Sequence, residues 1–97
     1  MPQGGYVYIM TNERNGTLYI GVTNNLARRV WEHQQRLYEG FSKKYQLKML
    51  VYYETHDSIE SAIAREKAMK KWPRQKKLDA IAAFNFFWHD LSKTLNA

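Results

Sequence analysis

The chain contains no cysteine, which excludes disulfide frameworks, thiolate metal centres and cysteine nucleophiles. We therefore expect a protein of the reducing cytoplasm. Long hydrophobic runs are also missing. The N-terminus has no apolar stretch of signal-peptide length, and no segment approaches the ~20 apolar residues of a membrane span. With 97 residues, the chain is too short for two independent cores. These absences predict one soluble cytoplasmic domain, 1–97, with no membrane partner.

Acidic residues are scarce relative to basic ones. The sequence has 15 Lys and Arg against 9 Asp and Glu, a formal net charge of +6. A positive balance attracts polyanions and speeds encounters with them. Cations concentrate on both sides of Pro73 and predict a surface that follows nucleic-acid phosphates: Lys67, Lys70, Lys71, Arg74, Lys76 and Lys77. A solvated junction between two helices is the alternative explanation of this run.

Hydrophobic periodicity and turn signals predict three strands and three helices. The strands are expected over 6–11, 17–22 and 47–55, and the helices over 26–38, 58–71 and 74–91. Within the third strand, an apolar run without polar alternation predicts burial on both faces. The order strand-strand-helix-strand-helix-helix favours an α+β fold in which helices pack around a small antiparallel sheet.

Polar residues predict where the helices begin. Asn24 and Asn25 are natural N-caps for the first helix. Asp57, followed three residues later by Glu60, resembles a capping box for the second helix. Segment 39–45 is predicted to be a loop, and it carries two lysines and two aromatic residues. Such a loop either contacts nucleic acid or packs its rings into the core.

Two short tyrosine segments predict the first hairpin. Tyr-Val-Tyr at 6–8 and Tyr-Ile-Gly at 19–21 are rich in β-branched and aromatic residues, as strands are. The Asn15-Gly16 step predicts the turn between them. Gly21 removes side-chain bulk beside a phenol, which suits the close approach of a backbone or a ligand.

One carboxylate falls on a helix face that should be apolar. Ile59, Ala62, Ile63 and Glu66 stand at i, i+3, i+4 and i+7, so they share one face of the second helix. Burying an unpaired charge is costly, so a carboxylate there needs a partner. Glu66 is either a metal ligand directed into a cleft or half of an ordinary i,i+4 ion pair with Lys70.

The other two helices also place polar residues beside apolar stripes. In the third helix, Asn85 follows Leu78 and Ile81 on one face. Most asparagines in such positions satisfy a backbone group near a helix end. In the first helix, Arg29 and His33 lie at the margin of the apolar stripe. Structural roles are the alternative for both, because an arginine can lay its stem along the edge of a core.

Together these segments resemble the GIY-YIG nuclease superfamily, in particular its small standalone single-domain members. The segments 6–8 and 19–21 stand where the two signature triplets of the family fall, and 25–29 matches the stretch whose arginine aligns with Arg29. The match continues through His33, the glutamate-bearing stretch 64–67 and a C-terminal signature: Asn85, Trp88, Asp90, Leu91 and Ser92. The resemblance covers nearly the whole chain.

The chain departs from the family pattern in two places. The first triplet has Tyr6 and Val7 in place of glycine and isoleucine, which leaves the Tyr8 hydroxyl in position. Phe86 stands where the standalone members usually have proline. This second change bears on the end of the third helix and on the assignment of Asn85.

The resemblance implies a three-stranded antiparallel sheet flanked by helices, and an endonuclease that hydrolyses phosphodiester bonds in DNA with one divalent metal ion. Tyr8 is the implied base that activates water, with Tyr19 as its hydrogen-bonded partner and His33 as acceptor of the Tyr8 proton. Arg29 would bind the phosphate. Glu66 would hold Mg²⁺, or Mn²⁺ in its place. Two further residues are implied to support the active site: Gly21 and Asn85.

Two other function classes compete with this interpretation. A non-catalytic nucleic-acid-binding module needs no core-facing carboxylate, so Tyr19, Arg29 and Glu66 favour the enzyme. A protein-interaction domain would dock through exposed Tyr and Trp, and the basic run argues against it. The sequence leaves open whether the substrate is single-stranded, duplex or branched DNA, or RNA. It also leaves open whether the protein is a monomer or a weak homodimer.

Overall fold

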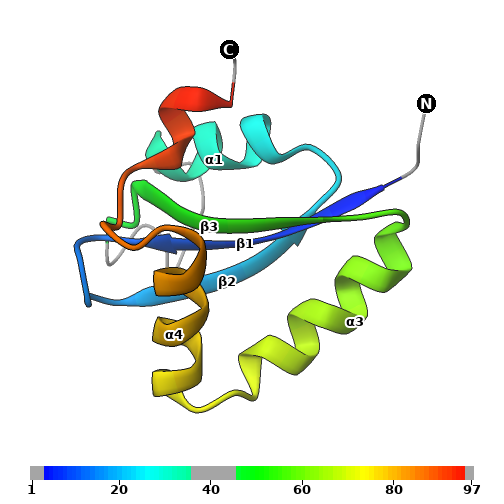
Figure 1. Cartoon of the computed structure of the whole chain (residues 1–97). Helices are drawn as coiled ribbons and strands as arrows, with labels where there is room; N and C mark the ends of the chain where they lie inside the picture. The colour runs from blue at the N-terminus through cyan, green and yellow to red at the C-terminus, as the bar shows by residue number, and fades with distance from the viewer. Residues whose placement is uncertain (1–3, 36–45, 96–97) are drawn as a thin grey trace.

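A computed structural model of the chain describes residues 4–35 and 46–95. Its regular elements follow the predicted order, with one added 3-10 helix near the C-terminus (Figure 1). The strands are β1 (Gly5–Thr11), β2 (Leu18–Thr23) and β3 (Met49–His56). The helices are α1 (Leu26–Gln34), α3 (Ile59–Lys70), α4 (Arg74–Phe84) and the 3-10 helix η1 (Leu91–Thr94). The predicted α+β class is confirmed.

The three strands form one antiparallel sheet in the order β2-β1-β3. Figure 1 shows α1 and η1 on one side of this sheet and α3 and α4 on the other. Successive side chains of a strand point to opposite faces. Accordingly, Val7 and Ile9 pack with α3 and α4, whereas Tyr8 and Met10 pack with α1. The central strand therefore sends its residues alternately into two cores.

Strand β3 is buried on both faces, as its apolar run predicts. Leu50 belongs to the core on the α1 side, and Val51 and Tyr52 belong to the core on the α3 side. The register against β1 shifts between Ile9 and Met10, where Tyr52 and Leu50 are their partners and Val51 has none. Val51 is thus the extra residue of a β-bulge.

The predicted hairpin turn between β1 and β2 is confirmed. Asn15 has a φ of 59°, in the left-handed region that asparagine tolerates. The Gly16 amide donates to the Glu13 carbonyl at 2.9 Å. Arg74 holds this turn against the start of α4, because its Nη2 donates to the carbonyls of Asn15 at 2.8 Å and Gly16 at 2.7 Å.

Of the predicted helix starts, one is confirmed and one is wrong. Asn25 caps α1, where its side chain accepts a hydrogen bond from the Arg28 amide at 3.2 Å. The capping box at Asp57 and Glu60 does not form. Ser58 is the N-cap of α3 and accepts from the Ser61 amide at 3.1 Å, because it stands directly before the first helical residue.

Element ends differ most from the prediction. Helix α1 ends at Gln34, and the Gln35 amide donates to the Trp31 carbonyl at 2.9 Å; the predicted end at residue 38 lies outside the described residues. Strand β3 begins at Met49 rather than at residue 47. The predicted loop 39–45 lies outside the described residues.

The third predicted helix is too long, since α4 ends at Phe84 and not at Leu91. Asn85 stops it by adopting a non-helical conformation, φ −150° and ψ 74°. The Asn85 side chain donates to the carbonyls of Val51 at 3.1 Å and His89 at 2.8 Å, and accepts from the His89 amide at 3.0 Å. Side-chain bonds of this kind compete with helix continuation.

In the part of the chain that the structure describes, no helix is both long and apolar enough to cross a membrane.

Replacing Asn85 with alanine removes all three of these hydrogen bonds. We expect Asn85→Ala to lower the free energy of unfolding by about 2 kcal/mol, because the Val51 carbonyl at the bulge loses its partner. Thermal unfolding followed by circular dichroism measures the change. Gln75→Ala, which removes an exposed contact with Asp79, is the control and should be nearly neutral. Equal destabilisation by the two substitutions would contradict the role given to Asn85.

Candidate active site

The phenol of Tyr8 occupies the centre of the candidate site. Tyr8 lies on the central strand β1 and is fully buried. Gly21 faces it in register on β2. A Cβ added at Gly21 would overlap the Tyr8 hydroxyl oxygen, and the ring carbon that carries it would lie only 2.5 Å away. The close approach predicted beside Gly21 is therefore present, and the group that approaches is the phenol of Tyr8.

His33 reaches this phenol from α1. Leu26, Val30 and His33 are the buried residues of the helix, at i, i+4 and i+7, so they form one inner face. The Nε2 atom of His33 lies 3.0 Å from the Tyr8 hydroxyl, within hydrogen-bond distance. His33 is only 1% exposed, so it lies within the core and not at the edge of the helix stripe.

The surroundings of His33 keep its ring neutral. Burial lowers the pKa of His33 to about 4, and the neighbouring Arg29 cation adds to the lowering. Glu32 opposes this effect and raises the pKa, but it is the smallest of the three influences. At neutral pH the ring is uncharged, so one of its nitrogens can accept a proton.

Tyr19 extends the cluster toward solvent. Its ring centroid lies 5.0 Å from that of His33 and 6.2 Å from that of Tyr8. Unlike Tyr8, Tyr19 is only partly buried. It also lines a cavity of about 330 Å³ with two cations, Lys70 and Lys77. Tyr19 therefore connects the buried Tyr8–His33 pair to a positively charged surface.

Arg29 lies one helical turn before His33 and lines a second cavity. This cavity of about 220 Å³, the Arg29 cavity, is lined by Thr23, Asn24, Asn25, Arg28, Arg29 and Glu32. The Arg29 Nε lies 3.3 Å from the Glu32 carboxylate, and the Arg28 Nε lies 3.6 Å from it. Sequence reasoning missed Glu32, although its i,i+3 and i,i+4 spacing from the two arginines is a recognised ion-pair signal. The Arg29 side chain is about one third exposed, 34%.

Glu66 is buried and also paired. It is 8% exposed, and one of its carboxylate oxygens lies 2.8 Å from Lys70 Nζ. The ion pair with Lys70 is therefore present, but on a buried carboxylate and not on an exposed face; the metal-ligand interpretation stays a prediction. The sequence predicted that Ile63 shares the buried face of the helix with Glu66, and this prediction is wrong because Ile63 is 37% exposed. The buried line of α3 runs through Ala62, Glu66 and Met69, a rotation of the helix that a four-residue pattern does not resolve.

The sheet separates Glu66 from Tyr8. Helix α3 packs on the face opposite α1, so the carboxylate and the phenol approach β2 from different sides. At this edge strand, Lys70, the partner of Glu66, and Tyr19 line the same cavity. Within residues 4–35 and 46–95, no three His, Cys, Asp or Glu side chains group in a way that could hold a metal. A metal held by Glu66 would therefore have fewer than three such protein ligands within these residues.

Asn85 lies apart from the tyrosine cluster. It bonds to Val51 on β3, while Tyr19 and Gly21 lie on β2, and these strands form opposite edges of the sheet. Its hydrogen bonds fit the structural alternative, in which the asparagine satisfies backbone groups near a helix end.

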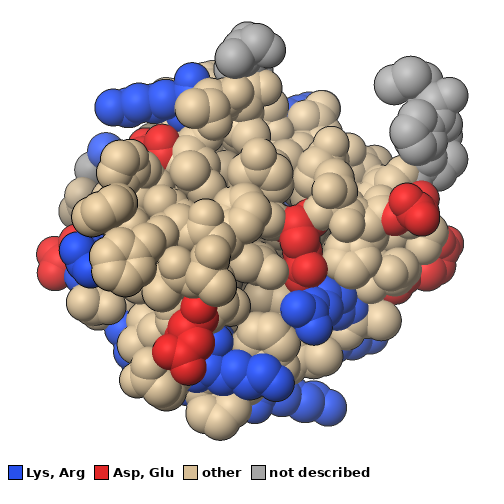
Figure 2. Space-filling view, viewed as in Figure 1, with Lys and Arg blue, Asp and Glu red and all other residues tan. Residues whose placement is uncertain are grey.

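The predicted basic residues gather where α3 passes into α4, and Figure 2 shows Lys and Arg side chains along this end of the molecule. Their surroundings differ. Lys70 pairs with Glu66, Arg74 holds the hairpin turn, and Lys76 lies over the Trp72 ring, 4.4 Å from its centroid. Lys77 lines the Tyr19 cavity, and the remaining two cations are exposed: Lys67 and Lys71.

Comparison with known proteins places the chain in a family. Residues 4–79 match the sequence model described as the GIY-YIG catalytic domain. A UPF0213 protein of Clostridium perfringens is 31% identical over 91 residues, covering 94% of this chain and 97% of that protein. A UPF0213 protein of Staphylococcus saprophyticus is 32% identical over 77 residues, covering 79% and 93%. Another, from Syntrophus aciditrophicus, is 36% identical over 77 residues, covering 78% and 87%.

No solved structure matches the chain. The family match contains both tyrosine segments, Arg29, His33 and Glu66, so it covers the buried cluster and the carboxylate described above. The chain belongs to the GIY-YIG family, among its small UPF0213 members.

Proposed function

We propose that the protein is a metal-dependent endonuclease that hydrolyses phosphodiester bonds in DNA. The observation that carries this proposal is the hydrogen-bonded pair of Tyr8 and His33, in which a buried phenol faces an imidazole kept neutral by its surroundings. Membership of the GIY-YIG family supports the same reaction class. A binding module that only holds a polyanion has no need of a proton acceptor behind a buried tyrosine.

The pair supplies general base catalysis. A phenol with an ordinary pKa of about 10 is a weak base at neutral pH unless its own proton can leave. Tyr8 is fully buried and Tyr19 beside it is partly exposed, so water would reach the Tyr8 oxygen past Tyr19. As that water attacks phosphorus, its proton passes to the Tyr8 oxygen, and the Tyr8 proton passes to His33 Nε2. The new bond joins the water oxygen to phosphorus, and the bond from phosphorus to the sugar oxygen breaks with its electron pair going to that oxygen, which takes a proton from solvent.

Substrate binding makes His33 a better acceptor. The Arg29 cation contributes to the low pKa of His33. A phosphate that pairs with the forked guanidinium of Arg29 offsets that charge, so the pKa of His33 rises when the substrate is bound. Arg29 then has two effects, because it holds the phosphate oxygens and its neutralisation prepares the base.

Glu66 suits a magnesium ligand. Mg²⁺ prefers carboxylate oxygens and keeps several waters, so one protein ligand together with substrate oxygens is an ordinary coordination set. The ion would stabilise negative charge on the phosphate and on the leaving oxygen. Lys70 pairs with the carboxylate and holds it in place, 2.8 Å from one oxygen. The cations Lys70 and Lys77 beside Tyr19 would guide the phosphate backbone to this edge of the sheet.

Cleavage of end-labelled single-stranded, duplex and branched DNA tests the proposal. We expect cutting that requires Mg²⁺ or Mn²⁺ and that falls at least about a hundredfold in Glu66→Gln, because the ligand charge is lost while the side-chain shape is kept. Glu60→Gln, an exposed change on the same helix, is the control and should cut normally. DNA binding without cutting, equal in all three proteins, would contradict the proposal and favour the non-catalytic module.

Tyr8→Phe removes one oxygen from the centre of the cluster. We expect cleavage to fall by about 10²- to 10⁴-fold, because the proton path to His33 is broken. Circular dichroism should show a native fold, since the ring that fills the core remains. Tyr52→Phe removes a hydroxyl from β3, outside the cluster, and should leave the rate unchanged. Normal turnover by Tyr8→Phe would overturn the assignment of the base.

His33 predicts how stability depends on pH. Its pKa is about 4 in the folded protein and about 6.5 in an unfolded chain, so the unfolded state binds more protons between these values. Above pH 7, the contribution of His33 to the free energy of unfolding should therefore not change with pH. Below about pH 6, the free energy of unfolding should fall by about 1.4 kcal/mol for each pH unit. Urea unfolding between pH 4.5 and 8 measures this slope. His33→Gln should lose this component, and His89→Gln, at an exposed position, should keep it. A slope unchanged in His33→Gln would contradict the prediction.

A further inference from the structure

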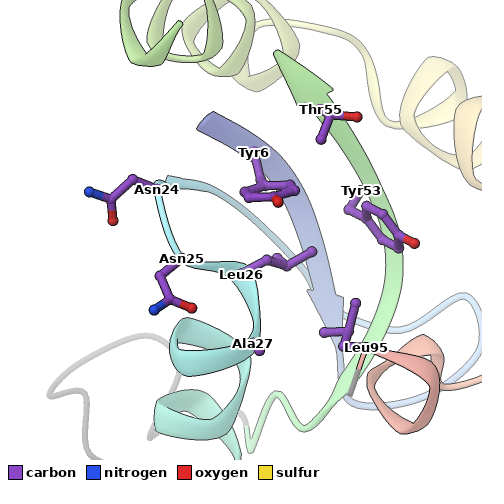
Figure 3. Close-up of a pocket in the computed structure, with 8 residues that line it drawn as sticks. All are labelled: Tyr6, Asn24, Asn25, Leu26, Ala27, Tyr53, Thr55 and Leu95. Atoms are coloured by element: carbon purple, nitrogen blue, oxygen red, sulfur yellow. The ribbon is translucent and has the colours of Figure 1, made fainter. Parts of the chain in front are cut away.

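A cavity unused by the mechanism lies where β1 begins, between the start of α1, β3 and η1 (Figure 3). It has a volume of about 430 Å³, and we name it the Tyr6 cavity. Its lining includes Tyr6, Asn24, Asn25, Leu26, Tyr53 and Leu95. Every residue of the lining is uncharged, although 25% of the chain is charged. The cavity therefore suits a neutral group with both apolar and hydrogen-bonding surface.

The Tyr6 cavity adjoins the Arg29 cavity. Asn24 and Asn25 line both of them, so the two hollows meet at these side chains. One side of the boundary carries Arg28 and Arg29, and the other carries aromatic rings and amides. A third hollow of about 400 Å³ continues from Tyr6 and Asn24 toward Asp57. The Asp57 carboxylate would oppose a phosphate there, so the phosphate belongs with Arg29.

The rings of the Tyr6 cavity are suited to a planar heterocycle. Figure 3 shows Tyr6 in the middle of the group, with Asn24 and Asn25 on one side and Tyr53 on the other. Tyr6 and Tyr53 are both partly exposed, as a stacking surface requires. Leu26 supplies an apolar surface below Tyr6.

The two asparagine amides add hydrogen-bonding groups. Asn25 uses its side-chain oxygen to cap α1, and no other residue in the described ranges engages its Nδ2 donors. The Asn24 side chain makes no hydrogen bond within residues 4–35 and 46–95. An amide offers both donors and an acceptor, which match the edge of a nucleobase.

We propose that the Tyr6 cavity binds one unpaired nucleobase of the nucleotide whose phosphate lies at Arg29. This inference rests on the proposed function and specifies its substrate. A base inside a continuous duplex is stacked on both faces and paired along its edge, so it cannot enter the cavity without leaving the helix. The substrate class is therefore DNA with an unpaired nucleotide beside the cleaved phosphate, as in a single strand or at a branch.

Two oligonucleotides of equal charge test the base subsite. The first is a fluorescently labelled thymidylate pentamer, and the second is the same pentamer with every base replaced by an abasic site. Binding is measured by fluorescence anisotropy in EDTA, so that no cleavage occurs. We expect the wild type to bind the thymidylate pentamer about tenfold more tightly, because base stacking is lost in the abasic chain.

Matched substitutions test whether the preference for the thymidylate pentamer arises in the Tyr6 cavity. Tyr6→Leu keeps an apolar side chain and should reduce the preference to about twofold or less. Phe87→Leu, an aromatic change at a position 67% exposed outside the cavity, should retain it. Should Tyr6→Leu fail to fold, thymidine 5′-monophosphate added to ¹⁵N-labelled wild type should shift the side-chain amide signals of Asn24 and Asn25.

Equal affinity of the wild type for both pentamers, or no detectable binding of either, would overturn the subsite. Unchanged preference in Tyr6→Leu, or amide signals that do not shift, would do the same. The result is separate from that of the nuclease test. Base preference in a protein that never cuts DNA would leave the subsite standing and overturn the endonuclease. Metal-dependent cutting without base preference would overturn only the subsite.

Discussion

The burial of one phenol constrains most of the site. Tyr8 is fully buried in the central strand, and its hydroxyl lies 3.0 Å from His33 Nε2. A buried hydroxyl without a partner would cost free energy, so the inner face of α1 must present a hydrogen-bonding group opposite the Tyr8 hydroxyl. The same phenol leaves no room for a side chain on the facing residue of β2, which is Gly21. One tyrosine thus restricts a residue on the neighbouring strand and another on the covering helix.

The arrangement of charges follows from the same burial. His33 remains neutral because it is desolvated, and the nearby Arg29 increases that effect. Glu32 draws in Arg28 and Arg29 at the helix surface, so positive charge lies close to the histidine without entering the core. On the other face, Glu66 tolerates burial because Lys70 lies 2.8 Å away. At the sheet edge, Tyr19 and Lys70, which belong to opposite sides of the sheet, line one cavity.

Some of this arrangement could be predicted from sequence and some could not. Strand alternation and the Asn15-Gly16 step predicted the hairpin, because both are local properties. Because Gly21 has no side chain, the sequence also predicted that another group lies close to the backbone of β2 there. Helical periodicity placed Glu66 on an inner face but misplaced Ile63, because a helix pattern defines its buried centre only to within a residue or two. The end of α4 was missed because Asn85 bonds to Val51, a contact across 34 positions of sequence that no local signal contains.

The position of the hollows was beyond sequence reasoning for a related reason. The Arg29 and Tyr6 cavities meet at Asn24 and Asn25, which appear in the sequence only as helix-capping residues. One of them does cap α1, and this role fixes the backbone where β2 turns into the helix. The same turn places the uncharged amides between an arginine pair and two tyrosines that come from other strands. One dipeptide therefore serves both a helix cap and the boundary of two cavities, and only the folded arrangement separates its members: the Asn25 side chain caps α1, whereas the Asn24 side chain projects away from Tyr6 (Figure 3).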